Sequence, residues 1–344
     1  MDELKQIPGL SELVGSPEYR SALGLPAAVT EEYRLLAQGE YNRNFRFRHP
    51  VTGKELLLRV NCGSQMHLEH QIEYESHALE LLAPSGRTPR VLYTDGSKRY
   101  TDHGVSVMEY LPGRPLDYHR DLERAAGILA DVHSVPLPGP SGLIEPADPL
   151  RAVLEECEEM LRVYLNSDLP PLSGKRKIRE LLDLAWERYH RTNRTGGARC
   201  IVNTELNNTN FLMAEEPDGP AGGRDWLIDW EKPLWSDPAQ DIAHFLVPTT
   251  TFWKTDVILS PGETADFLTA YEASVSGRID LTGLRERLGV FMPVTCMRGV
   301  TWCAMAWVQY QKEEKELSND STRRKLEAYL SDSFLEEIRR IEEA

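Results

Sequence analysis

The sequence predicts an α+β fold in two parts, a small strand-rich N-terminal lobe and a large, mainly helical C-terminal lobe. Up to about Gly113, apolar and polar residues alternate and turn residues recur, which is typical of strands. From Asp121 onward the apolar residues recur at helical spacing. A chain of 344 residues can bury a core in each lobe. We expect the lobes to span residues 1–112 and 113–344, with a ligand-binding cleft between them.

The N-terminal lobe is predicted to contain a hairpin, a helix and a further strand. Its segments are a strand over residues 45–48, a turn over 50–53, a strand over 56–60, a helix over about 66–83 and a strand over 105–110. The last strand ends at Pro112 and Gly113, which break regular structure and are predicted to join the lobes.

The C-terminal lobe is predicted to be helical apart from one short interruption. The helices cover residues 122–133, 150–165 and 175–190, with several more after Asp241, the last of them amphipathic. Brief apolar pieces at residues 200–202, 211–213 and 226–228 predict a small sheet beneath a functional site. Residues 217–223 are typical of a surface loop.

Composition narrows the possible partners and location. The net charge of −15 argues against a nucleic-acid or anionic-membrane partner, since both require a basic surface. Five scattered cysteines without C-x-x-C spacing argue against a disulfide framework or a zinc site. The N-terminus lacks a signal-peptide pattern, and no apolar run approaches the roughly 20 residues of a membrane span. We therefore expect a cytoplasmic protein.

Glu75 interrupts the apolar stripe of the helix over residues 66–83. Leu68, Ile72, Leu79 and Leu82 form that stripe, and its spacing passes through position 75. An unpaired buried carboxylate is costly, so Glu75 is predicted to pair with Arg59, the only charge inside the preceding apolar strand. Alternatively, a slight rotation of the helix brings Glu75 to solvent. A buried pair of this kind can hold nucleotide phosphates.

Two polar segments carry further candidate ligands. Residues 203–210 are rich in Asn, Thr and Glu and lie between apolar strands, which fits either a site or an ordinary Asx-rich turn. Asp229 follows the apolar residues 226–228. Mg²⁺ prefers hard oxygen ligands, and Asn210 and Asp229 offer an amide and a carboxylate oxygen. Asp229 can alternatively cap a turn, and Asp237 or Asp241 can cap the next helix.

Taken in order, these segments resemble the aminoglycoside phosphotransferase and choline kinase-like family, which has the protein-kinase fold. The likeness extends from about Tyr33 to Leu246. Its pieces are residues 39–44 for the nucleotide loop, 57–60 for the phosphate-contacting cation, 75–79 for the paired acid, 108–113 for the adenine hinge, 129–133 for a supporting helix, 203–210 for the catalytic loop and 228–231 for the metal-binding acid.

The resemblance implies a bilobal protein-kinase-like fold and a role for each matched residue. The nucleotide is expected to contact Gly39 and Asn42 of the loop, Arg59 fixed by Glu75, and backbone groups of Glu109 and Leu111. Catalysis is expected to involve Glu205, Asn210 and Asp229, of which Asn210 and Asp229 bind Mg²⁺. Asp241 is expected to brace the catalytic loop.

The chain departs from the family pattern at two loop positions. Asn203 stands where the family has His, and Glu205 stands where it has the base Asp. A carboxylate displaced by one methylene keeps its chemistry but changes its position. We expect an ATP- and Mg²⁺-dependent phosphotransferase acting on a hydroxyl of an aminoglycoside, an amino alcohol or a sugar-like metabolite. The alternatives are a nucleotide-binding pseudokinase and, less compatible with Glu75 and Asp229, a helical interaction protein.

The substrate is expected to lie on the helical lobe, against helices that follow Asp241. Trp302, Met305 and Gln309 share a face at helical spacing there. A core stripe is the commoner explanation of such a pattern.

Overall fold

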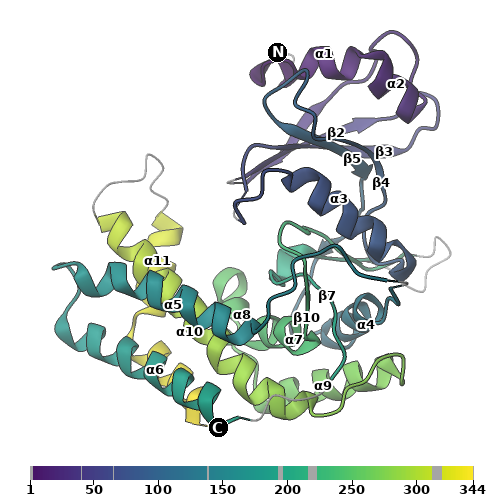
Figure 1. The fold of residues 1–344 in the computed structure, drawn as a ribbon. Coiled ribbons are helices and arrows are strands. Elements are labelled where there is room, and N and C mark those ends of the chain that lie inside the picture. The colour runs from purple at the N-terminus through teal and green to yellow at the C-terminus, as the bar shows by residue number, and fades with distance from the viewer. Residues whose placement is uncertain are drawn as a thin grey trace. The chain divides into compact units, whose positions relative to one another are not determined.

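The computed structural model describes residues 3–39, 41–64, 66–137, 139–192, 197–215, 223–311 and 320–343. The chain divides into two compact units (Figure 1). Unit 1 consists of Met1–Pro115, Ser134–Leu143 and Asn210–Pro233, and unit 2 consists of Leu116–His133, Ile144–Thr209 and Leu234–Ala344. Glu40 of the predicted nucleotide loop and residues 217–222 of the predicted surface loop lie outside the described residues.

An antiparallel five-stranded sheet in the order β1-β2-β3-β5-β4 forms the centre of unit 1. The strands are β1 Arg34–Gln38, β2 Asn42–Arg48, β3 Glu55–Asn61, β4 Val91–Asp95 and β5 Gly104–Glu109. The predicted hairpin is confirmed, because β2 and β3 pair with Phe45 opposite Leu58. The strand predicted over residues 105–110 is β5, shifted by one residue.

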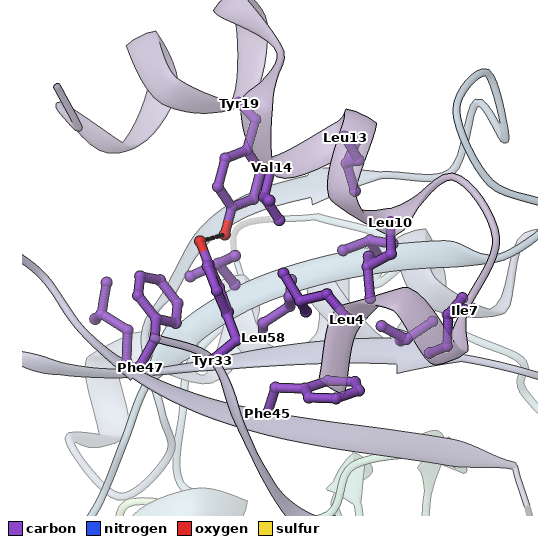
Figure 2. Packing of buried hydrophobic residues seen from close by; sticks show 14 of the residues in the cluster. Leu4, Ile7, Leu10, Leu13, Val14, Tyr19, Tyr33, Phe45, Phe47 and Leu58 are labelled. Carbon is purple, nitrogen blue, oxygen red and sulfur yellow. Dashed lines mark hydrogen bonds between the residues drawn. The ribbon is translucent and has the colours of Figure 1, made fainter. Parts of the chain in front are cut away.

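Short N-terminal helices that the sequence analysis missed contribute to the core of unit 1. They are the 3-10 helix η1 Glu3–Gln6, α1 Leu10–Gly15 and α2 Pro17–Leu23. Figure 2 shows Leu10 and Leu13 of α1 in one buried cluster with Phe45 and Leu58 of the sheet. The hydroxyl of Tyr19 hydrogen bonds to that of Tyr33 at 3.2 Å, which ties α2 to the chain before β1 (Figure 2). The sheet therefore has its apolar face covered by the N-terminal residues.

Helix α3 spans Gln71–Leu82, so the helix predicted from residue 66 begins five residues later. His67 has a φ of 56°, a left-handed conformation that an α-helix excludes. Leu68 consequently lies before the helix and is not part of its stripe. Ala83 opens the 3-10 helix η2 Ala83–Ser85, and the predicted end of α3 is correct to within one residue.

Unit 2 consists mainly of helices, as predicted. They are α4 Leu122–His133, α5 Pro149–Asn166, α6 Leu172–Arg191, α7 Pro238–Leu246, α8 Pro248–Thr255, α9 Pro261–Val275, α10 Leu284–Gln311, α11 Asp320–Tyr329 and α12 Asp332–Glu343. Helix α10 packs against α5, α6 and α7. Its 28 residues are long and apolar enough to cross a membrane, a feature that the sequence analysis missed, but 61% of the relevant window is buried inside the protein. That burial is typical of a core helix.

The face of α10 that carries Trp302, Met305 and Gln309 is not a core stripe. Trp302 is 37% exposed, and the other two side chains are partly exposed. The core side of the helix instead presents residues such as Met297 and Val300, which are fully buried. The explanation of this pattern as a core stripe is therefore wrong.

The short strands form two small sheets instead of the single sheet predicted. In unit 1, β8 Phe211–Met213 pairs with β9 Trp226–Leu227 and with β6 Arg114–Pro115. In unit 2, β7 Cys200–Val202 pairs with β10 Leu234–Ser236. The partner of β7 is a strand that the apolar pattern did not reveal, because Leu234 and Trp235 are only half-buried.

Glu342 of α12 is a buried carboxylate, and neither of its oxygens has a hydrogen-bond partner among the described residues. Burial raises the pKa of Glu342 to about 8, and the attraction of Arg188 offsets only part of this effect. Because the folded protein binds this proton more tightly than the unfolded chain does, stability is expected to fall as pH rises from about 4.5 to 8.

Glu342→Gln is expected to remove most of this pH dependence and to raise stability at pH 9 by on the order of 3 kcal/mol. Urea unfolding at pH 6 and pH 9 measures the effect. Glu336→Gln, which neutralises an exposed acid of the same helix, provides the matched control. Equal pH dependence in both variants and in the unmodified protein would contradict this account.

Candidate active site

Arg59 of β3 forms the centre of a cluster of acidic side chains in unit 1. Its Nε lies 3.2 Å from Oε1 of Glu75, and its Nη2 lies 3.0 Å from Oδ1 of Asp229 and 2.9 Å from Oε1 of Glu231. Glu75 is 2% exposed, so the predicted buried pair is confirmed and the alternative of a solvent-facing Glu75 is wrong. The cluster joins the predicted phosphate-contacting cation to the predicted metal-binding acid.

The cluster holds more negative than positive charge. One guanidinium faces three carboxylates, which gives +1 − 3 = −2 when all are ionised. Burial raises the pKa of Glu75 to about 7 against the attraction of Arg59, and the charge of Asp229 adds to the rise. Burial and the charge of Asp229 likewise raise the pKa of Glu231 to about 7. The pKa of Arg59 is raised because the attraction of the three acids outweighs its burial.

Hydrogen bonds from three elements fix the segment around Glu231. Asn42 donates through Nδ2 to Oε1 of Glu231 at 2.7 Å, and Asn61 donates to Oδ1 of Asn42 at 3.0 Å. Gln71, the first residue of α3, donates to the carbonyl of Glu231 at 2.7 Å. The sequence analysis assigned no role to Glu231, although it is the second acid of the quoted segment 228–231.

The nucleotide-loop residues Gly39 and Asn42 lie at the turn between β1 and β2. The N–H of Gly39 donates to the carbonyl of Asn42 at 2.9 Å, which closes the turn. Asn42 is 3% exposed and belongs to the hydrogen-bond network of Glu231. The structure thus brings Asn42 and Arg59 together at one acid, whereas Gly39 shapes the turn.

Pairing of β8 with β9 places Asn210 and Asp229 at neighbouring positions. Phe211 lies opposite Leu227, and the N–H of Ile228 donates to the carbonyl of Asn210 at 2.8 Å. Asp229 follows Ile228 with a φ of 64°, a strained conformation for a residue other than Gly. Its side chain is 33% exposed, whereas Asn210 is 6% exposed. The backbones of the two predicted metal-binding residues therefore lie close together at one end of this small sheet, and metal binding by them stays a prediction.

The predicted adenine hinge follows β5. Glu109 is the last residue of β5, and its backbone N–H donates to the carbonyl of Arg90 at 3.0 Å. Leu111 lies in the connection between β5 and β6. Adenine binding by these two residues stays a prediction.

In unit 2, Asp241 holds the first residues of the predicted catalytic loop. Its carboxylate accepts the backbone N–H of Asn203 at 2.7 Å and that of Thr204 at 2.8 Å. Thr204 has a φ of 69°, so these bonds stabilise a strained turn. His133 lies 3.3 Å from the same carboxylate. The bracing geometry expected for Asp241 is confirmed, and the cap of α7 is Asp237.

Asn203 and His244 fix the loop around Glu205. The side-chain carbonyl of Asn203 accepts the backbone N–H of Glu205 at 3.0 Å, the local pattern of an Asx turn. The N–H of Leu206 donates to Nδ1 of His244 at 3.1 Å. Asn203 is fully buried and so acts as a scaffold at the position where the resemblance led us to expect His.

A protein-family model matches most of the chain. The model of the phosphotransferase enzyme family matches residues 32–286. The chain belongs to this family. It is therefore a member of a family of small-molecule kinases, as the resemblance implied. No curated protein gave a significant match.

Solved structures share the fold of this family member over nearly its whole length. They include a provisionally assigned aminoglycoside phosphotransferase from Ralstonia eutropha JMP134 (TM-score 0.70, 13% identity, 97% of each chain covered). A spectinomycin phosphotransferase in complex with ADP and spectinomycin has a TM-score of 0.64 at 12% identity, with 96% of this chain and 97% of that chain covered. Choline kinase from Cryptosporidium parvum Iowa II has a TM-score of 0.60 at 13% identity, with 98% and 93% covered. The predicted kinase-like fold is thereby confirmed.

The donor set near Arg59 fits a magnesium ion. Asp229 and Asn210 supply hard oxygen atoms, and Mg²⁺ commonly takes only one or two protein ligands besides phosphates and water. The excess negative charge of the cluster matches a divalent cation. Among the described residues, no group of three or more His, Cys, Asp or Glu side chains is arranged to hold a metal ion.

Asp241→Asn is expected to lower kcat by about 10- to 100-fold. The substitution is expected to displace the catalytic loop, and a displacement of ~1 Å in an active site lowers the rate by up to this factor. Asn retains one acceptor oxygen for the two backbone N–H groups, so the nucleotide KM is expected to stay within about 3-fold. Steady-state kinetics separates the two parameters. Asp237→Asn, which alters the cap of the same helix, is the control. An unchanged kcat for Asp241→Asn would refute the bracing role.

Proposed function

We propose that the protein transfers the γ-phosphoryl group of ATP, with Mg²⁺, to a hydroxyl of a small molecule. The observation that supports this most strongly is the cluster of Arg59 with three carboxylates, because its surplus of acidic groups suits the Mg²⁺ ion that accompanies the nucleotide phosphates. Family membership supports the reaction class. One protein of the same fold, the spectinomycin phosphotransferase, has been solved with ADP and with AMP.

We assign the nucleotide to residues of unit 1. Arg59, oriented by Glu75, would contact the phosphates, and backbone groups of Glu109 and Leu111 would hold the adenine. Gly39 and Asn42 would shape the loop over the phosphates. Asn210 and Asp229 would hold Mg²⁺, which offsets the negative charge of the phosphates.

Glu205 is the proposed base. In the transfer step the acceptor oxygen bonds to the γ-phosphorus while the bond from that phosphorus to ADP breaks, and the hydroxyl proton passes to Glu205. Glu205 and Asn210 lie five positions apart in one segment, so the loop that Asp241 braces carries both the base and the start of the metal site.

The acceptor is proposed to be an aminoglycoside, an amino alcohol or a sugar-like metabolite. Solved structures of this fold include a spectinomycin phosphotransferase, an ethanolamine kinase and a macrolide 2'-phosphotransferase, so the fold accommodates chemically different acceptors. We further propose a cytoplasmic location. The net charge of −15 supports the proposal that the protein has no nucleic-acid or membrane partner.

The experiment is an ADP-release assay with Mg-ATP and a panel of amino sugars, amino alcohols and sugars. The protein is expected to turn over at least one acceptor, and Glu205→Gln is expected to lower kcat by about 100-fold or more. Glu159→Gln, at an exposed acid of unit 2, should leave kcat unchanged. No turnover with any acceptor, combined with retained nucleotide binding, would refute the proposal.

A nucleotide-binding pseudokinase is the second candidate, and Asn203 and Glu205 favour it because they depart from the catalytic-loop pattern that the resemblance implied. Glu205→Asp separates the two candidates. If the protein is an enzyme whose site is adapted to Glu205, the Glu205→Asp variant should keep or lose the activity of the unmodified protein. A pseudokinase has no activity that this change could remove. Activity that first appears in Glu205→Asp would identify a disabled site.

A further inference from the structure

One carboxylate oxygen of Glu231 is held by two buried donors. Oε1 of Glu231 lies 2.9 Å from Nη2 of Arg59 and accepts a hydrogen bond of 2.7 Å from Nδ2 of Asn42. Arg59 is 6% exposed and Asn42 is 3% exposed. Glu75 fixes the guanidinium from one side, and Asn61 donates to the side-chain carbonyl of Asn42 at 3.0 Å. The two donors therefore form a preorganised position for an oxygen atom that carries negative charge.

The same two donors belong to the residues that the proposed function assigns to the nucleotide phosphates and their loop. A phosphate oxygen accepts hydrogen bonds from a guanidinium and an amide as a carboxylate oxygen does. Nη2 of Arg59 lies 3.0 Å from Oδ1 of Asp229 as well, so Glu231 and Asp229 already share this nitrogen. A phosphate that approaches Nη2 of Arg59 and Nδ2 of Asn42 must therefore displace the carboxylate of Glu231.

Glu231 is the acid of the cluster that is best placed to move away from Arg59. The side chain of Glu75 is 2% exposed, so it has no path to water. Asp229 belongs to the proposed metal site. The side chain of Glu231 is 19% exposed, whereas its backbone carbonyl accepts a hydrogen bond of 2.7 Å from Gln71. Rotation about the side-chain torsions can thus bring the carboxylate to water while the backbone stays in place.

The charge of the cluster makes this exchange depend on the metal. Three carboxylates surround one guanidinium, so the phosphates of a metal-free nucleotide would add negative charge to an acidic surplus. A nucleotide complexed with Mg²⁺ carries less negative charge, and the proposed metal site engages Asp229. The displacement of Glu231 is therefore expected to cost much more for the metal-free nucleotide than for its Mg²⁺ complex.

We propose that Glu231 is a specificity-determining residue that competes with nucleotide phosphates for Arg59 and Asn42. Through this competition it excludes metal-free nucleoside diphosphates and triphosphates and admits their Mg²⁺ complexes. Selection of this kind acts through repulsion of the wrong ligand. This inference rests on the proposed function, because it requires the phosphates to bind at Arg59.

Calorimetric titration with ADP at pH 8.5, in excess Mg²⁺ or in EDTA, tests the competition without any need for turnover. The unmodified protein is expected to bind ADP more weakly in EDTA, by about 100-fold or more. Glu231→Gln keeps the size of the side chain and an acceptor oxygen for Asn42 but removes the charge. It should tighten metal-free ADP binding by about 10- to 100-fold and leave the Mg-ADP affinity within about 3-fold. Glu69→Gln, at an exposed acid of unit 1, is the matched control and should change neither affinity.

Adenosine provides a second measurement, because it has no phosphate to compete with Glu231. Its affinity should be the same in the unmodified protein and in Glu231→Gln, which also shows that the variant is folded. An unchanged ratio of Mg-ADP to metal-free ADP affinity in Glu231→Gln would overturn the competition and leave the proposed function standing. A large loss of Mg-ADP affinity in this variant would make Glu231 a ligand of the metal and would also overturn the competition. If the unmodified protein bound no Mg-ADP, the proposed function would fall together with this inference.

Discussion

Replacing Arg59 by Met is expected to destabilise the protein by about 3 to 5 kcal/mol at pH 8, the usual cost of removing one partner from a buried ion pair. Because Met retains most of the side-chain volume, the loss of stability measures the effect of removing the positive charge. Glu75 is 2% exposed and would remain buried without its counter-ion. Glu231 and Asp229 would lose the same cation. Urea unfolding followed by circular dichroism measures the change.

The size of this effect should depend on pH. The pKa of Glu75 and that of Glu231 are already raised to about 7, so the folded protein retains these protons above the pKa of the unfolded chain. Their stability contribution therefore falls as pH rises from about 4.5 to 7. Without Arg59 both pKa values rise further, so the cost of Arg59→Met should be larger at pH 8 than at pH 5.5.

Two controls separate this explanation from a general loss of packing. Arg46→Met removes an exposed cation of the neighbouring strand β2, paired with Glu55 at 2.9 Å, and should cost less than about 1 kcal/mol. Glu75→Gln combined with Arg59→Met should recover part of the lost stability, because no buried charge remains at position 75. A pH-independent loss that Glu75→Gln does not relieve would contradict the assigned cause.

Local patterns predicted the elements whose side chains alternate or recur regularly. β3 and α3 have such patterns, and the interruption of the α3 stripe at Glu75 predicted a buried partner. The N-terminal helices α1 and α2 have six and seven residues, which is too short for a periodicity to emerge. All five side chains of β1 are exposed, so β1 has no alternation to detect. Capping signals at Ser16, Pro17 and Gly24 nevertheless mark α2 in the sequence.

The part of the site that depends on distant contacts could not be predicted. Asn42 and Glu231 are 189 positions apart, and neither residue's neighbours indicate that they hydrogen bond. The same holds for Arg298 of α10 and Glu156 of α5, which hydrogen bond although they are 142 positions apart. Arg59 and Glu75 are 16 positions apart, on a strand and on the next helix. The cost of burying an unpaired Glu75 was therefore enough to predict that it pairs with Arg59. Sequence alone thus identified the pair but not the full acidic cluster.

Asp229→Asn is expected to abolish Mg²⁺-dependent nucleotide binding while changing stability little. Asn tolerates the left-handed backbone, so the φ of 64° at this position is retained. The substitution loses an ion pair with Arg59 but relieves repulsion from Glu75 and Glu231, and these effects oppose one another. Turnover should fall by two to three orders of magnitude, as is usual when a preorganised charge is removed from an active site.

Proton release gives this prediction a second readout. A divalent cation bound beside Glu75 and Glu231 lowers carboxyl pKa values that are about 7 without it, so Mg-ATP binding near pH 7 should release protons. Calorimetric titrations in two buffers of different ionisation enthalpy count those protons. Asp229→Asn should release few or none, whereas Asp102→Asn, at an exposed acid of unit 1, should match the unmodified protein. Unaltered Mg-ATP affinity and proton release in Asp229→Asn would exclude Asp229 as the metal ligand, because no other carboxylate of the cluster lies next to Asn210 across the β8–β9 pair.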